Sequence, residues 1–195
     1  NYQVKILSPQ LLGRLHLNES CELEKDSSHA ILIWPIEEKP KILAITTTGR
    51  VALVKWEFAG QQPGMIDKFL PGGLEGETIV DILKLPENNE LSFGLLSSDG
   101  SFKRIPIEEI LELSGRAATI LKLKDGVELK SSVLCPKNGE VIIISSYGRA
   151  LRLEISEKTM PLMGKLAQGP ITMKTFPGEE IIGAITTKNT NNNFV

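Results

Sequence analysis

Short apolar runs alternate with polar turns along most of this chain. The apolar runs cover 42–46, 51–58, 91–96, 102–107, 141–145 and 149–155, with turn-forming residues between them. Runs of this length, rich in Val, Ile, Leu, Phe and Thr, predict β-strands. The stretch 107–113 (IEEILEL) has some helical character, but it is short enough for only a turn of helix or a loop. The pattern therefore predicts an all-β fold.

The pattern also repeats. The stretches ILAITTTGRVALVKW, LSFGLLSSDGSFKRIPI and VIIISSYGRALRLEI each contain an apolar run, a polar turn ending in glycine, and a second run with Lys or Arg. The turn glycines are Gly49, Gly100 and Gly148, about fifty residues apart. Glycine tolerates the positive φ that tight hairpin turns require. Each stretch is therefore predicted to form a two-stranded hairpin.

A second marker recurs in phase with the first. A glycine precedes an acidic residue and an apolar run in GLEGETIVDI, LKDGVELKSS and FPGEEIIGAI, at Gly76, Gly126 and Gly178. Four short strands in about fifty residues is the size of one propeller blade, and such a blade must stack on its neighbours. We expect a divergent leader over 1–40, blades over 41–89, 90–139 and 140–180, and the start of a further blade over 181–195. The leader is expected to combine a linker with a strand of a preceding blade around Trp34, and the chain to be a fragment of something longer.

The third repeat resembles a known family. Its loop and strand MPLMGKLAQGPITMK and its turn PGEEIIG resemble a blade of the C-terminal domain of the DNA gyrase A subunit, or of the related topoisomerase IV protein. The second repeat supplies SGRAATILKLKDGVEL in the same register, and the first supplies the shorter FLPGGLEGETIV. The resemblance covers roughly residues 42–187.

The resemblance implies a β-pinwheel, a propeller-like ring whose blades exchange strands. It further implies that the domain wraps double-stranded DNA on a basic outer rim, and so directs strand passage and supercoiling by a bacterial, cytoplasmic, nucleoid-associated enzyme. The parent would be an ATP-dependent type II topoisomerase, whose ATPase B subunit would be a partner together with the rest of the A subunit. The glycine-rich basic box of the family's gyrase members, Q-R-R-G-G-K-G, is absent; LPGGLEG keeps its Gly-Gly but carries Pro71, Leu74 and Glu75. Gyrase and topoisomerase IV both remain open as the parent.

Cations recur at matched places in the repeats. The candidates for DNA contacts are Arg50, Lys55, Lys103, Arg104, Arg116, Arg149, Arg152 and Lys165. They are either ordinary solvated side chains or a curved row that neutralises phosphates and bends DNA without reading its bases. Strand alternation places Arg152 opposite Leu151 and Leu153, with Arg149 still in the turn. With a formal net charge of -2, any basic surface must be local.

Other classes of function find little support. Neither tyrosine is expected to be catalytic, no metal or cofactor site is expected, and no apolar run reaches the roughly 20 residues of a membrane span. The two cysteines, Cys21 and Cys135, are expected to be free thiols in a reducing compartment. The main alternative is a protein-interaction propeller without a DNA role, which scattered rather than aligned cations would favour. A scaffold or enzyme propeller is a second alternative, but the expected polar cluster at a central channel is not visible.

Overall fold

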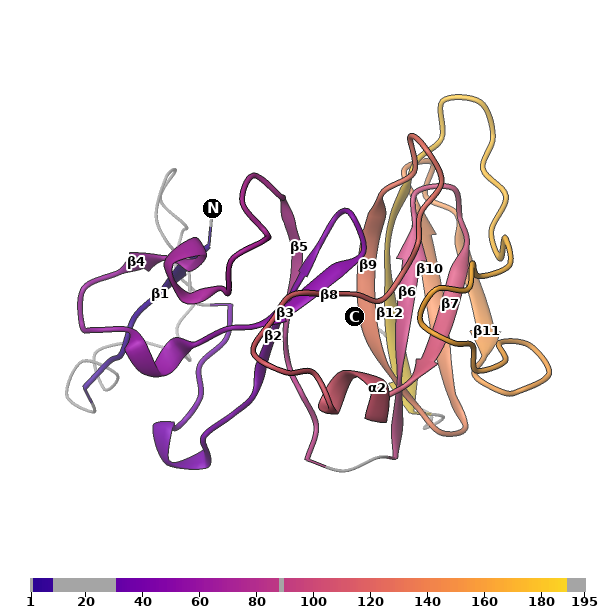
Figure 1. The fold of residues 1–195 in the computed structure, drawn as a ribbon. Helices are drawn as coiled ribbons and strands as arrows, with labels where there is room; N and C mark the ends of the chain where they lie inside the picture. The colour runs from indigo at the N-terminus through magenta and orange to yellow at the C-terminus, as the bar shows by residue number, and fades with distance from the viewer. Residues whose placement is uncertain (1, 9–30, 88–89, 189–195) are drawn as a thin grey trace, which may run out of the picture.

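The structure, a computed structural model, describes residues 2–8, 31–87 and 90–188. Within them the chain forms three successive antiparallel sheets and a two-stranded ribbon (Figure 1). The first sheet contains β2 (Ile42–Thr46), β3 (Arg50–Leu53) and β5 (Ile79–Lys84). The second contains β6 (Leu91–Ser97), β7 (Phe102–Pro106) and β9 (Leu129–Pro136). The third contains β10 (Gly139–Ser145), β11 (Ala150–Glu154) and β12 (Ile181–Lys188). We call each sheet, with the loops between its strands, the first, second and third unit.

Short elements fill the connections. They are β1 (Gln3–Val4), η1 (Ile36–Glu38), η2 (Trp56–Phe58), β4 (Gly64–Met65), η3 (Ile66–Phe69), α2 (Glu108–Leu111) and β8 (Ala118–Thr119). The helical turn α2 lies in the stretch with helical character, and the predicted all-β class is confirmed. The second strand of the first unit is shorter than predicted, because the chain leaves the sheet after Leu53 and enters η2.

The three units share one plan. In each sheet the first strand of the unit lies in the centre, with the second and third strands antiparallel on either side. Each central strand has a register shift at its last residue, which is a hydroxyl residue every time: Thr46, Ser97 or Ser145. The turn glycines after these strands all have positive φ, 79° at Gly49 and 73° at Gly148. The predicted hairpins are therefore present in all three units.

Neighbouring units exchange backbone pairing. Strand β8 belongs to the second unit by sequence, but it pairs with β3 of the first, with Thr119 opposite Arg50. In the same way Ile171 of the third unit bridges Ser101 of the second. In the first unit the matching segment is strand β4, which pairs with β1 near the N-terminus. We call residues 64–68, 118–122 and 170–174 the exchange segments. Each exchange segment pairs with a segment that comes before its own unit in the chain.

Hydrophobic clusters lie between units as well as within them. One cluster joins Leu43 and Ile45 of the first unit to Phe93 and Leu95 of the second. Another joins the second unit to the third, where β9 lies against β12. A third packs β1 and residues around it onto the first unit. The architecture is therefore a stack in which each unit buries apolar surface against its neighbour.

Two features of the expected organisation are corrected. The run at 181–185 does not open a further blade, because β12 pairs with β10 along its length and completes the third sheet. Residues 31–35 form no strand; instead, Lys84 Nζ lies 5.0 Å from the centre of the Trp34 ring. The sheets of the second and third units have three strands each within the described residues, and the fourth strand of the first sheet is β8. Residues 1 and 9–30, with Cys21, and 88–89 and 189–195 lie outside the described residues.

Candidate nucleic-acid interface

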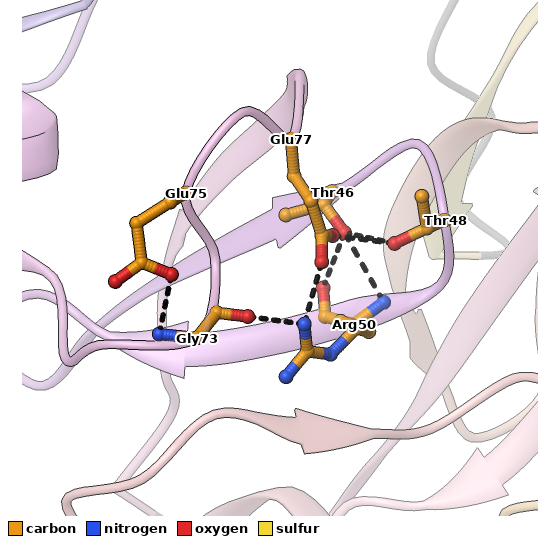
Figure 2. A network of polar contacts seen from close by, with 6 residues as sticks. All are labelled: Thr46, Thr48, Arg50, Gly73, Glu75 and Glu77. Carbon is orange, nitrogen blue, oxygen red and sulfur yellow. Dashed lines mark hydrogen bonds and ion pairs between the residues drawn. The ribbon is translucent and has the colours of Figure 1, made fainter.

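Arg50 is bound to its own unit. Its Nη1 lies 2.6 Å from Glu77 Oε1 and also donates to the carbonyl oxygen of Gly73 (Figure 2). Burial opposes ionisation of Glu77, but hydrogen bonds from Thr46, Thr48 and Arg50 outweigh it and hold the pKa of that carboxyl below its usual value. The arginine after the first turn glycine thus ties the hairpin to the loop that leads into β5.

Arg149 repeats this arrangement in the third unit. Its Nη2 lies 2.5 Å from Glu179 Oε2 and 2.7 Å from the carbonyl oxygen of Lys174. Hydrogen bonds from Arg149 first, and from Ser145 and the backbone amide of Phe176 in addition, lower the pKa of Glu179 to about 2 despite its burial. The charge of each turn arginine is therefore largely neutralised within its own unit.

The second unit lacks this pair and buries the two cations of its hairpin. Lys103 is 1% exposed, and its Nζ donates to the carbonyl oxygens of Ile120, at 3.0 Å, and Lys165. Burial lowers the pKa of Lys103 to about 8, against the attraction of Glu109. Arg104 is 6% exposed, pairs with Glu157, and leaves its Nε without a hydrogen-bond partner in the described residues. The expectation that these two side chains lie on an exposed rim is wrong, because the loop of the third unit covers β7.

The other predicted cations are accessible. Arg152 is 60% exposed on β11 and contacts Glu140 across the sheet at 2.5 Å. Lys165 lies in the loop after β11, 3.9 Å from Glu109. Lys55 and Arg116 are exposed, and no other described residue forms an ion pair with them. A role of these residues in DNA binding stays a prediction.

The structure reveals a row of lysines that the sequence interpretation missed. The amide of Ile120 donates to the carbonyl oxygen of Gly49, and the amide of Thr172 donates to that of Gly100. Lys122 and Lys174 each follow two residues later, so they occupy the same position on successive units. In the first unit the amide of Ile66 donates instead to the carbonyl oxygen of Tyr2, and Lys68, in η3, follows Ile66 by two residues.

These three residues, Lys68, Lys122 and Lys174, are here called the lysine row. All three are exposed and form no ion pair with another described residue. A sequence signal existed for two of them, since Lys122 and Lys174 each precede a glycine of the second marker by four residues. The first repeat breaks that spacing with the longer LPGGLEG stretch, which hides the match. The lysine row thus supplies one free cation per unit.

A shallow hollow lies beside the middle lysine. It has a volume of about 310 Å³ and is lined by Thr47, Thr48 and Arg50 of the first hairpin, by Thr119 and Lys122 of the exchange segment, and by Glu128. Hydroxyl donors next to a lysine suit a phosphate oxygen, which accepts hydrogen bonds and attracts positive charge. Lys122 and the hydroxyl groups of Thr47 and Thr119 are thus grouped at the junction of two units, whereas Thr48 already donates to Glu77 and Glu128 adds a carboxylate.

Three further features of the described residues concern metal ligands, membrane-spanning helices and the thiol of Cys135. They contain no group of three or more His, Cys, Asp or Glu side chains placed to hold a metal ion. No helix in the described part of the chain is long and apolar enough to cross a bilayer. Cys135 is buried with a free thiol, and burial raises its pKa to about 12. The thiolate needed for nucleophilic chemistry is therefore disfavoured there.

Comparison with known proteins decides the fold. No family model matches the chain. Over 114 residues, 56% of this chain, the sequence is 25% identical to the DNA gyrase A subunit of Granulibacter bethesdensis, of which the match covers 12%. A solved C-terminal domain of DNA topoisomerase IV matches with a TM-score of 0.65 and 17% identity, over 77% of this chain and 48% of that one. A DNA gyrase A C-terminal domain matches with a TM-score of 0.63 and 19% identity, over 75% and 47%.

The chain has the fold of these C-terminal domains. The C-terminal domain of Escherichia coli ParC matches as well, with a TM-score of 0.59 and 13% identity over 76% of this chain and 62% of that one. The resemblance drawn from the repeats and the predicted β-pinwheel are confirmed. The chain spans about half the length of the first two solved domains.

Proposed function

We propose that this chain belongs to the C-terminal domain of the DNA-cleaving half of a type IIA topoisomerase, its A subunit, where it binds double-stranded DNA. The sequence similarity to DNA gyrase and the shared fold support this proposal. In the parent enzyme the domain holds a DNA segment so that strand passage has a preferred direction. Its partners are then DNA, the ATPase B subunit, the remainder of its own polypeptide and, in the bacterial cytoplasm, the nucleoid. Cleavage chemistry is left to other parts of the enzyme.

The lysine row is the observation that carries the proposal. Equivalent exposed lysines on three successive units place positive charge once per unit. Neutralised phosphates release counterions, so such a row favours binding to a DNA backbone without reading bases. The lysine row takes the place of the hairpin arginines, which are held by Glu77 and Glu179. Lys55, Arg116, Arg152 and Lys165 provide further contacts in this proposal.

Removing the lysine row tests the proposal. We expect the triple change Lys68→Gln, Lys122→Gln and Lys174→Gln to weaken binding to a labelled duplex by at least about tenfold at low salt. The dependence of log affinity on log salt concentration should become less steep by roughly 0.9 for each lysine that contacts a phosphate. Fluorescence anisotropy over a salt series measures both quantities.

A matched control removes three positive charges from the end of the units that lies opposite the hairpin turns. Lys41, Lys137 and Lys158 are also exposed, but they lie before β2, between β9 and β10, and after β11, away from the hairpin turns. Changing all three to Gln should leave duplex affinity within about twofold of the original if position matters, beyond a small effect of net charge. Equal losses in the two triple variants would overturn the placement of the DNA on the lysine row.

Wrapping itself has a separate test. A nicked plasmid is ligated in the presence of the chain, the protein is removed, and the linking number is read on a gel. A shift of one sign supports wrapping, and its loss in the lysine-row variant ties wrapping to these residues. Salt-sensitive binding without a shift means that the chain holds DNA without wrapping it. No binding to duplex DNA contradicts the proposal.

One observation favours the alternative of a protein-binding propeller. Ile144, Ile182 and Ile185 are exposed on the third unit, and Ile144 and Ile185 lie on neighbouring strands β10 and β12. In the second unit the matching residues, Leu96 and Val133, are buried against the third unit. A further unit of this kind is the partner that such a face fits. Self-association that Ile185→Lys abolishes, together with absent DNA binding, would favour this function.

A further inference from the structure

The third unit carries two exposed aromatic side chains beside cations. Tyr147, in the hairpin turn, is 58% exposed, and Phe176, in the loop before β12, is 57% exposed. Among the described residues neither belongs to one of the three hydrophobic clusters. Large apolar rings left in solvent close together often mark a binding surface.

Contacts within the unit hold these rings in place. Tyr147 Oη donates to the carbonyl oxygen of Pro177 at 3.1 Å. Arg149 Cζ lies 4.3 Å from the centre of the Phe176 ring, a cation–π contact. Arg149 also donates to the Lys174 carbonyl oxygen, so the turn and the loop are fastened together. The two rings are thus presented by two joined segments, which reduces the entropy lost when a ligand binds, and the backbone of Lys174 belongs to the same joined loop.

The repeat itself does not explain these aromatic residues. Thr48 and Asp99 occupy the position of Tyr147 in the first two units. Counting from the lysine row, Leu70 and Lys124 occupy the position of Phe176. The first two units form the same hairpin and exchange segment with these residues, so folding does not require an aromatic side chain at either position.

A hollow adjoins the pair. Its volume is about 500 Å³, within the range of small-molecule sites, and its lining includes Arg149, Thr172 and Lys174. Arg149 is neutralised by Glu179 and supports Phe176, whereas Lys174 has no ion-pair partner among the described residues. The hollow therefore has a lysine without an ion-pair partner and a hydroxyl group in its lining. The aromatic rings do not line it, but Phe176 lies against Arg149 at its edge.

We propose that Tyr147, Phe176 and Lys174 form a binding site for unpaired nucleotides of single-stranded DNA. An aromatic ring offers its face to any base, and a cation next to it attracts the phosphate that follows, which gives binding with little sequence preference. Paired bases are already stacked inside the duplex, so they cannot use the rings without being unstacked. The inference rests on the proposed function in that it gives the third unit a second mode of DNA binding, beside the duplex contacts of the lysine row.

The test compares single-stranded and duplex probes. Binding of a labelled single strand of about 12 nucleotides and of its duplex is measured by anisotropy. We expect Phe176→Ala to weaken single-strand binding about tenfold, and Phe176→Ala with Tyr147→Ala to weaken it further. Duplex affinity should stay within about twofold, because no charge is removed. Phe176→Trp should restore single-strand binding. Phe58→Ala is the matched control, since Phe58 is 79% exposed in the first unit.

Each result has a defined meaning. Unchanged single-strand binding by the folded double variant overturns the inference, whatever the duplex result. If the double variant is unfolded by circular dichroism, Phe176→Leu decides instead, because leucine keeps an apolar side chain without a ring face. Normal duplex binding with no aromatic effect leaves the proposed function standing. Single-strand binding that needs the rings, with no duplex binding at all, supports this site and contradicts the proposed function.

Discussion

Arg149 and Glu179 form the same ion pair in the third unit that Arg50 and Glu77 form in the first, with closest distances of 2.5 and 2.6 Å. In the second unit the two matching positions hold Ser101 and Val127, so both members of the pair are missing together. The ion pair therefore links a hairpin turn to the loop before the third strand of the same unit. It also removes these arginines from the set of free cations.

Reversing the charge at Arg149 should destabilise the third unit. Arg149→Glu places a second carboxylate beside the buried Glu179, and breaking a buried pair leaves one charge uncompensated. We expect the melting temperature to fall by about 5 °C or more, whereas Arg152→Glu should lower it by less than about 2 °C because that pair lies at an exposed surface. Thermal unfolding followed by circular dichroism compares the two variants. Equal shifts in melting temperature would mean that the Arg149 ion pair stabilises the fold no more than the Arg152 ion pair does.

Acid should weaken the ion pair between Arg149 and Glu179. The pKa of Glu179 is about 2 in the folded chain, against an ordinary value of 4.5. Because the folded pKa is lowered, its contribution is full above about pH 4.5 and is lost as the pH falls towards 2. Urea unfolding between these pH values should show a larger loss of stability in the original chain than in Glu179→Gln. Parallel curves for the two proteins would contradict the assignment.

Lys103 should give a dependence of the same sign, but at alkaline pH. Burial lowers its pKa from 10.5 to about 8, so between these values the folded chain binds fewer protons than the unfolded chain. The contribution of this residue to stability should therefore rise as the pH increases from 8 to 10.5. Its neutral amine still has two N–H groups for the carbonyl oxygens of Ile120 and Lys165. The measurement is urea unfolding of the original chain and of Lys103→Met across this range, and a constant difference would count against the prediction.

Two turn glycines of the same conformation should tolerate alanine differently. Gly100 and Gly148 both have positive φ, 78° and 73°. A Cβ atom on Gly100 would lie 1.8 Å from the Met173 carbonyl oxygen, whereas one on Gly148 would meet nothing within 4 Å. We expect Gly148→Ala to cost about 1 kcal/mol through backbone strain, and Gly100→Ala to cost at least about 3 kcal/mol because the exchange segment must move. Denaturant unfolding measures both; similar costs would mean that the third unit adjusts freely.

Local features of this fold could be predicted from the sequence. The hairpins around Gly49, Gly100 and Gly148 depend on an apolar run, a polar turn and a glycine with positive φ, all within a few residues. Their period predicts repeated β units, and the resemblance of these repeats to a known family implied the β-pinwheel that is confirmed. The second set of glycines likewise indicates where the third strand of each unit begins.

Pairing between distant segments could not be read in the same way. The run at 181–185 is predicted to open a new blade, but it pairs with β10, about forty residues earlier in the chain. Exposure of Lys103 and Arg104 is predicted from their place in the second hairpin, which matches that of the cations in the other two, yet a loop of the third unit covers them. When a segment far away in the sequence buries a strand, the sequence of that strand shows no pattern that would predict the burial.

The sequence by itself determined the repeated hairpins, the all-β class and the likeness to a β-pinwheel, because each depends on residues close together in the chain. The tertiary structure alone decided which cations are free. Arg50 and Arg149 are neutralised by glutamates that lie beyond the intervening loop. The match of Lys68 to Lys122 and Lys174 appears only in the pairing of each exchange segment with an earlier segment of the chain. The physical reason is that a side chain's charge acts at a surface only after packing has settled its burial and its partners, and packing joins residues that the sequence keeps apart.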